Sequence, residues 1–232
     1  MKMKPCPNCG APAEEGQRFC GECGAKLDWE PLPHEPVYTE DERLKNDPAL
    51  NTPVSGPKPK KELRAAAMPY PVYRDGATGP WYVSGYMGNT GAMKVDDKCA
   101  EKPHSGETCM KIEYSANDNW AGIFWQSPAG DWGDKPGGVN LSKASTLVFW
   151  ARGEKGGEKV SFFMGGIGKD KPFHDTANRK LENVVLKKSW TRYRITLDGE
   201  DLSQIKTGFG FNFGGQGKPF AFYLDDIEYV AD

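Results

Sequence analysis

The segment "NWAGIFWQ", residues 119–126, places two tryptophans and a phenylalanine in a run short enough to be one β-strand. Successive side chains of a strand point to opposite faces, so Ala121, Ile123 and Trp125 are predicted to face inward together. The opposite face then carries Trp120, Gly122, Phe124 and Gln126. A tryptophan, a glycine and an amide on one face suit either a packed layer or a platform on which a flat ligand such as a sugar can stack.

The same β character continues on both sides of this segment. From Tyr70 to the C-terminus, short aromatic and β-branched runs alternate with Gly, Pro, Asn and Asp turns, and no long helical period is present. So many short strands predict two packed antiparallel sheets. We therefore predict an all-β chain whose main domain, residues 70–232, is an antiparallel β-sandwich or jelly roll.

Four of the six cysteines lie near the N-terminus in two Cys-x-x-Cys-Gly knuckles. The first knuckle holds Cys6 and Cys9, and the second holds Cys20 and Cys23. Two knuckles supply the four thiolates of a tetrahedral Zn²⁺ site and leave no open position for catalysis, so the zinc is predicted to be structural. Two disulfides or redox dithiols are the alternative, but so short a segment needs a metal or a crosslink to fold.

This N-terminal segment resembles the short zinc-ribbon family found at the N-termini of many prokaryotic proteins. The matching residues are Cys6, Pro7, Cys9, Gly10, Phe19, Cys20, Cys23 and Gly24, followed by "AKL". The resemblance implies a zinc ribbon over residues 1–27.

Residues 28–69 differ in composition from both flanking segments. They are rich in proline and charge and have no apolar period that could pack a helix. We predict a flexible linker here, extended where proline dominates.

Overall charge and hydropathy exclude several classes of partner. A formal net charge of −2 gives no electrostatic reason to bind nucleic acid. The apolar runs are far shorter than the roughly 20 residues of a membrane span. No apolar segment follows the N-terminal lysines, so no signal peptide is predicted and we expect a cytoplasmic location, with export by another route left open.

Three segments of the β-domain resemble the galactose-binding-like jelly rolls among carbohydrate-binding modules. They are "NLSKASTLVFWARGEKGGEKVSFFMGG", "SWTRYRITLDGEDLSQIKTGFGFNF" and "FAFYLDDIEYV". The nearest groups are families 4, 11 and 22, and the likeness extends over residues 70–232. It implies a jelly-roll fold and a β-glucan-type polysaccharide as the ligand.

We therefore expect a glycan-binding face that includes the outward side of residues 119–126. Trp120 would stack on the sugar, Gln126 would contact its hydroxyls, and Trp132, in a Gly-rich loop, would form the rim. Tyr86 is a further candidate, and Arg152, together with Trp150, is expected to extend the same surface. For each aromatic, burial in the core is the alternative.

Catalysis is not expected. A glycosidase needs two carboxyl groups facing one scissile bond. Asp225 and Asp226 are adjacent on a strand and so point to opposite faces. No G-x-S-x-G, phosphate-loop or dinucleotide motif is present.

Calcium is expected because the modules that this chain resembles use two acids to hold a structural ion. One acid lies on the closing strand and the other near the start of the domain, which implies Asp225, or its neighbour Asp226, with Asp75 as oxygen ligands. Simple surface carboxylates are the alternative.

Cys99 and Cys109 flank a loop between two predicted strands and are left as either buried thiols or a hairpin disulfide.

Two functions follow from these observations. The first is a non-catalytic glycan-binding module attached to a structural zinc ribbon. The alternative is a protein-interaction or self-assembly module that uses the ribbon and the sandwich surface.

Overall fold

The computed structural model describes residues 3–5, 12–14 and 63–231. The chain divides into two units, Met1–Lys60 and Lys61–Asp232. In the first unit, strand β1 (Met3–Pro5) pairs antiparallel with β2 (Pro12–Glu14). The four knuckle cysteines and most of the predicted linker lie outside the described residues.

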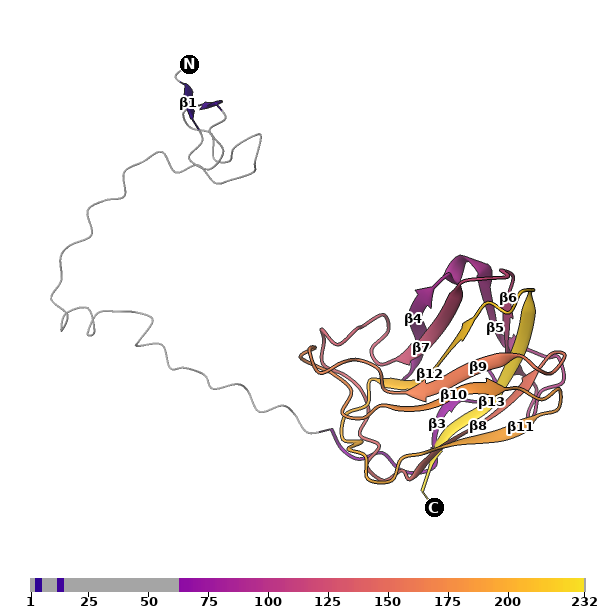
Figure 1. Cartoon of the computed structure of the whole chain (residues 1–232). Coiled ribbons are helices and arrows are strands. Elements are labelled where there is room, and N and C mark those ends of the chain that lie inside the picture. The colour runs from indigo at the N-terminus through magenta and orange to yellow at the C-terminus, as the bar shows by residue number, and fades with distance from the viewer. Residues whose placement is uncertain (1–2, 6–11, 15–62, 232) are drawn as a thin grey trace. The chain divides into compact units, whose positions relative to one another are not determined.

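The second unit is a sandwich of two antiparallel sheets, as the sequence predicts (Figure 1). The five-stranded sheet has the order β10 (Arg179–Val185), β9 (Lys159–Met164), β12 (Thr207–Gly214), β7 (Trp120–Gln126) and β4 (Tyr82–Gly88). The six-stranded sheet has the order β11 (Thr191–Thr196), β8 (Thr146–Gly153), β13 (Phe220–Val230), β6 (Cys109–Tyr114) and β5 (Met93–Cys99), with β3 (Tyr70–Tyr73) also paired to β13. In the described residues the only helical element is the 3₁₀ turn η1 (Thr90–Ala92). None of the described segments forms a helix long and apolar enough to cross a membrane.

The core lies between the two sheets and is rich in aromatic residues. Ala121, Ile123 and Trp125 are fully buried in it, so the predicted inward face of β7 is confirmed. The Trp125 ring meets Phe209 of β12 edge-on, with 5.3 Å between the ring centroids. Because this side of β7 packs in the core, the other side of the strand faces outward.

Residues 63–69, which the sequence assigns to the linker, pack on the sandwich. The side chain of Asn140 donates to the carbonyl of Leu63 at 2.8 Å, and the Ala66 amide donates to the Asn140 carbonyl at 2.8 Å. Ala66 and Met68 also pack against the core. The structured part of the second unit therefore begins upstream of Tyr70.

Candidate functional site

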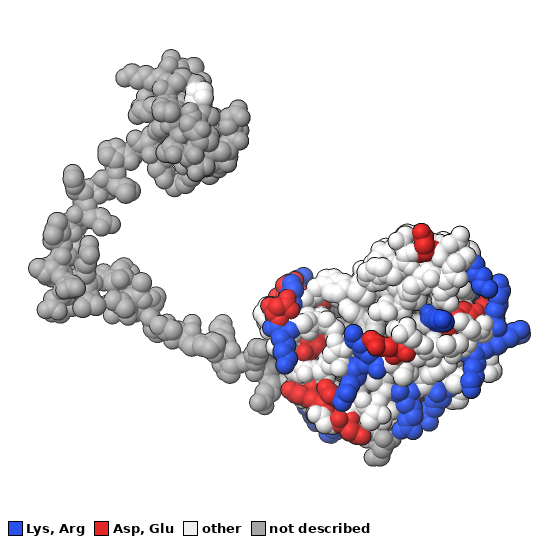
Figure 2. Space-filling model, in the orientation of Figure 1, with Lys and Arg blue, Asp and Glu red and all other residues white. Residues whose placement is uncertain are grey.

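The outward side of β7 belongs to one continuous surface, which we call the outer face of the five-stranded sheet. Trp120, Gly122 and Phe124 lie opposite Gly214, Asn212 and Gly210 of β12. Asn212 and Gly210 in turn lie opposite Ser161 and Phe163 of β9. In Figure 2 the surface over β4 and β7 is almost free of charged residues. The rings of Phe124 and Phe163 fill the space above Gly210, so the open part of this face lies around Asn212 and Gly214.

Trp120 is 51% exposed, although its backbone is tightly held. The Asn89 amide donates to the Trp120 carbonyl at 2.8 Å. Gly88 has a φ of +71°, and a Cβ there would collide with the same carbonyl and approach the indole. A glycine is therefore required at the end of β4, and the indole is presented to solvent from a fixed backbone.

A hollow of about 250 Å³ lies next to Trp120 on this face. Its lining includes Ser161, Asn183 and Asn212, and also Gly214, which is paired with Trp120. Within the described part of the chain, the side-chain amides of Asn183 and Asn212 have no hydrogen-bond partner. Both amides are therefore available to a ligand that enters the hollow.

Trp132 lies further along the same face and is 37% exposed. Its ring centroid is 5.5 Å from that of Phe124, which meets Phe163 edge-on at 4.9 Å. Phe124 follows Trp120 by four residues, about 13 Å along the strand. The outer face thus carries two exposed indoles at separate points, an arrangement that suits an extended ligand.

The loop that carries Trp132 is anchored by a buried ion pair between Asp131 and Lys206, which the sequence analysis missed. The Lys206 ammonium contacts the Asp131 carboxylate and also donates to the Lys135 carbonyl at 2.5 Å. The Asp131 carboxylate accepts the amides of Gly133 and Asp134 at 3.3 and 3.2 Å. Burial tends to raise the pKa of Asp131, but the hydrogen bond and charge of Lys206 lower it overall.

A second buried carboxylate, Asp175, joins the neighbouring loop to the same lysine segment. It accepts the amides of Ile167 at 2.9 Å, Lys206 at 2.5 Å and Thr207 at 2.9 Å.

The sequence carries only a weak signal for the buried pair of Asp131 and Lys206. Asp131 is followed two residues later by a glycine in "GDWGDK", and Lys206 is the one lysine within the apolar run "QIKTGF". Both resemble ordinary solvated loop residues.

Gln126 was predicted to contact the ligand, and this is wrong. The side chain is fully buried, and its carboxamide oxygen accepts the Ser84 hydroxyl at 3.0 Å. Ser84 also accepts the Gly130 amide at 2.9 Å. The amide therefore serves to join β4, β7 and the following loop rather than to face solvent.

Arg152 and Trp150 do not extend the outer face, because β8 belongs to the six-stranded sheet. The Arg152 guanidinium lies 3.5 Å from the centroid of the Tyr223 ring and donates to the Glu101 carbonyl at 2.8 Å. Trp150 stacks on His104 with 3.7 Å between ring centroids. These contacts stabilise the loop between β5 and β6.

Tyr86 does not share the direction of Trp120 either. It pairs with Ile123, whose side chain faces the core, so Tyr86 projects from the inward side of β4 at the margin of the sheet. Its side chain is nevertheless 48% exposed, because β4 is the last strand of this sheet.

The two acids expected to bind calcium both accept backbone amides of the β5–β6 loop. Asp75 accepts the amides of Glu107 at 2.8 Å and Thr108 at 3.1 Å. Asp225 is fully buried and accepts the His104 amide at 2.9 Å. Burial raises the pKa of the Asp225 carboxyl. Among the described residues, no three His, Cys, Asp or Glu side chains converge in a way that could hold a metal ion.

Cys99 and Cys109 are paired in register across β5 and β6, and both are buried free thiols. The Cys109 thiol donates to the Cys99 carbonyl at 3.5 Å. Burial raises the pKa of Cys109 to about 12, so this thiol is protonated near neutral pH.

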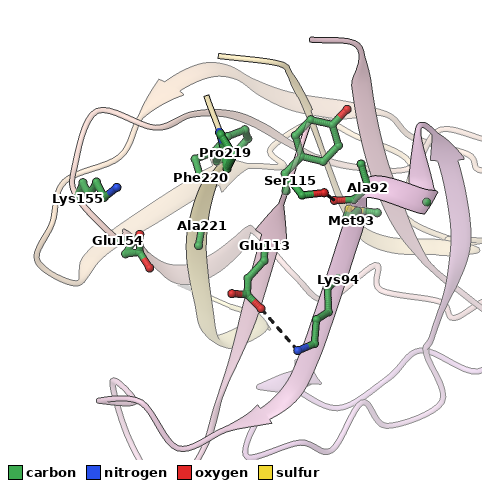
Figure 3. A pocket seen from close by; sticks show the side chains of 12 residues that line it. Ala92, Met93, Lys94, Glu113, Ser115, Glu154, Lys155, Pro219, Phe220 and Ala221 are labelled. Atoms are coloured by element: carbon green, nitrogen blue, oxygen red, sulfur yellow. Dashed lines mark hydrogen bonds and ion pairs between the residues drawn. The ribbon is translucent and has the colours of Figure 1, made fainter. Parts of the chain in front are cut away.

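A larger hollow, of about 510 Å³, lies on the six-stranded sheet (Figure 3). Lys94 and Glu113 form an ion pair of 3.8 Å in its wall. Its two aromatic residues, Tyr114 and Phe220, are buried. This hollow therefore lacks the exposed aromatic ring that distinguishes the outer face of the other sheet.

Residues 2–27 match the zinc-ribbon domain family. No curated protein matches the chain. Among solved structures, a family 11 carbohydrate-binding module of a cellulosomal cellulase of Clostridium thermocellum is similar at 18% identity and a TM-score of 0.47. The match covers 72% of this chain and 97% of that chain. A family 30 carbohydrate-binding module is similar at 16% identity and a TM-score of 0.49, and this match covers 72% of this chain and 100% of that chain. A glycoside hydrolase domain of Endo-D from Streptococcus pneumoniae R6 matches at 14% identity and a TM-score of 0.44, over 66% of this chain and 22% of that chain.

Proposed function

We propose that the sandwich is a non-catalytic glycan-binding module that takes a β-glucan-type polysaccharide on the outer face of the five-stranded sheet. The observation that carries the proposal is the half-exposed Trp120 beside a hollow in which the side-chain amides of Asn183 and Asn212 have no partner in the described part of the chain. The resemblance of residues 70–232 to modules of families 4, 11 and 22 makes β-glucans the first ligands to test.

The chemistry of the face fits a sugar chain. The C–H face of a pyranose ring is apolar and stacks on an indole, whereas its hydroxyl groups require donors and acceptors at fixed positions. Trp120 offers the first surface, and Asn212 and Asn183 offer both donors and acceptors. Because Trp132 lies further along the same face, a chain of several sugars would make more contacts than a single ring.

Binding rather than hydrolysis is supported by the groups around the hollow. Hydrolysis requires two carboxyl groups on either side of the glycosidic bond. The polar side chains lining the hollow beside Trp120 are those of lysine, serine, asparagine and glutamine, and no carboxylate is among these described lining residues.

Titration of the zinc-loaded full chain with soluble mixed-linkage β-glucan, followed by tryptophan fluorescence, tests this proposal. A Cβ at Gly214 would meet no atom within 4 Å, so Gly214→Leu should narrow the hollow without disturbing the fold. We expect this variant to bind at least tenfold more weakly. Gly91→Leu is the matched control, because Gly91 is equally unobstructed but lines the hollow on the other sheet.

Three outcomes of this experiment would contradict the proposal. They are no saturable fluorescence response to soluble β-glucan, unchanged affinity in Gly214→Leu, or equal loss of affinity in Gly91→Leu.

We further propose that the N-terminal ribbon holds one structural Zn²⁺ through Cys6, Cys9, Cys20 and Cys23, in keeping with the family match over residues 2–27. Elemental analysis of protein purified without chelator should find one zinc per chain. Cys20→Ser should lower zinc content to near zero, because a structural site needs all four ligands. The melting temperature of the sandwich should not change. Zinc-free wild-type protein would refute the site.

Calcium at Asp75 and Asp225 stays a prediction. Calcium takes six to eight oxygen ligands, and both carboxylates keep lone pairs beyond the amides that they accept. If the site binds, millimolar CaCl₂ should raise the melting temperature of the sandwich, since a ligand of the native state alone stabilises it. MgCl₂ at the same concentration controls for ionic strength. Superimposable melting curves in CaCl₂ and MgCl₂ would show that Asp75 and Asp225 do not form a calcium site.

A further inference from the structure

Five strands of the two sheets have one unpaired edge. Four of them end the strand orders, namely β4 and β10 in the five-stranded sheet and β5 and β11 in the six-stranded sheet. The fifth is β3, which pairs only with β13. An exposed edge presents free N–H and C=O groups that can pair with another strand, and natural proteins commonly block such edges with charged side chains.

Three of these edge strands carry charges, whereas β4 carries none. The charged residues are Lys94, Asp96, Asp97 and Lys98 in β5, Arg179, Lys180 and Glu182 in β10, and Arg192 and Arg194 in β11. The sequence of β4 is "YVSGYMG". β3 is uncharged too, but it contains Pro71, which has no amide N–H to donate. Among the described edge strands, β4 is therefore the one that carries neither a charge nor a proline.

The side chains of β4 are also unusually apolar for an exposed edge. Tyr82 is 52% and Tyr86 48% exposed, and they project from opposite sides of the strand, since Tyr82 pairs with Gln126 and Tyr86 with Ile123. Its backbone hydrogen bonds within the described residues go to β7, apart from the Tyr82 carbonyl, which accepts the Ser84 hydroxyl. A register shift between Val83 and Gly85 is the single irregularity, and the pairing from Gly85 to Gly88 is regular.

We propose that β4 pairs antiparallel with β4 of a second copy of this chain, about a two-fold axis. An antiparallel pair of identical strands is two-fold symmetric, so each strand supplies the donors and acceptors that the other needs. No charged side chain is brought to the junction in such a pair, whereas two copies of β5, β10 or β11 would bring several together. The exposed tyrosines on both sides of the strand would pack across the junction. This proposal does not depend on glycan binding.

The proposed contact is small, and we expect it to be weak. A seven-residue strand offers much less area than the roughly 1,600 Å² of a standard interface, so we expect a dissociation constant on the order of 10–100 µM. Pairing would join two five-stranded sheets into one and align their outer faces. If these faces bind glycan, the dimer would then engage a polymer at two points.

Sedimentation velocity of the zinc-loaded full chain, from about 1 to 500 µM, tests the proposal. The wild type should pass from monomer to dimer over this range. Tyr86→Lys places a charge on the edge and should weaken the dimer at least tenfold. Val185→Lys is the matched control, because Val185 is a 57% exposed apolar residue of the charged edge strand β10, and it should dimerise as the wild type does.

The outcomes separate the proposal from its alternatives. A wild type that stays monomeric at 500 µM overturns it, as does a dimer that Tyr86→Lys leaves unchanged. Equal loss in Val185→Lys would place the contact on β10, and loss in Cys20→Ser would place it in the ribbon. If the melting temperature shows that Tyr86→Lys is misfolded, Tyr82→Lys replaces it, with the same expected weakening.

Discussion

Lys206→Met should lower the free energy of unfolding of the sandwich by about 3–5 kcal/mol, because it leaves the Asp131 carboxylate buried without its cation. Lys206 is fully buried and Asp131 is 5% exposed, so water cannot replace the lost partner. For a domain of this size the melting temperature should fall by on the order of 10 °C. Urea unfolding followed by tryptophan fluorescence measures the loss.

A nearby surface pair provides the matched control. Lys171 and Asp134 form an ion pair of 3.0 Å, with side chains 37% and 63% exposed. Exposed pairs contribute about 0–1 kcal/mol, so Lys171→Met should change stability by less than 1 kcal/mol. If Lys206→Met costs no more than Lys171→Met, the buried pair does not anchor the loop.

The dependence on pH gives an independent test of the same pair. The pKa of Asp131 is lowered in the folded protein, so its contribution is fully present above the unfolded value near 4 and is lost as pH falls through the lowered folded value. In Lys206→Met the isolated carboxyl should instead bind a proton more readily in the folded state. The stability difference between wild type and variant should therefore be largest near neutral pH. It should narrow as pH falls, first through the raised pKa of Asp131 in the folded variant and then through its lowered pKa in the folded wild type.

The sequence predicted the sandwich and the inward face of β7 because both depend on local alternation. Ala121, Ile123 and Trp125 follow a period of two, and their burial needs no knowledge of the neighbouring strands. Zinc ligation is predicted from the same kind of local spacing. These are the features that a single strand or knuckle encodes by itself.

The sequence could not predict which strand joins which sheet. Arg152 was assigned to the surface of Trp120, but β8 pairs with β13, whose residues lie about 70 positions later in the chain. Gln126 is buried because its carboxamide binds the Ser84 hydroxyl of β4, to which the Gly130 amide of the loop after β7 also donates. Both errors concern long-range packing, which the local pattern does not contain. The buried pair of Asp131 and Lys206 escaped for the same reason, since its partners are 75 residues apart.

Trp120→Ala should reduce affinity for β-glucan below detection and leave the fold intact. Stacking on one aromatic ring contributes on the order of 1–2 kcal/mol, which is a change of about fivefold to thirtyfold in the dissociation constant. Because a shallow face with few such contacts binds weakly, losing this one should suffice. The indole is 51% exposed, so the change should cost at most about 1 kcal/mol of stability. Titration calorimetry and urea unfolding of the same preparation measure both quantities.

Two further variants determine how the result is read. Trp132→Ala should also weaken binding, but at a larger cost in stability, because its ring packs on Phe124 at 5.5 Å. Val185→Ala removes an equally exposed apolar side chain from β10 and should affect neither quantity. A loss of about 3–5 kcal/mol in Trp120→Ala would show that the indole stabilises the fold as a buried aromatic does. Unchanged affinity in a stable Trp120→Ala would remove this residue from the ligand site and leave Trp132 as the aromatic contact.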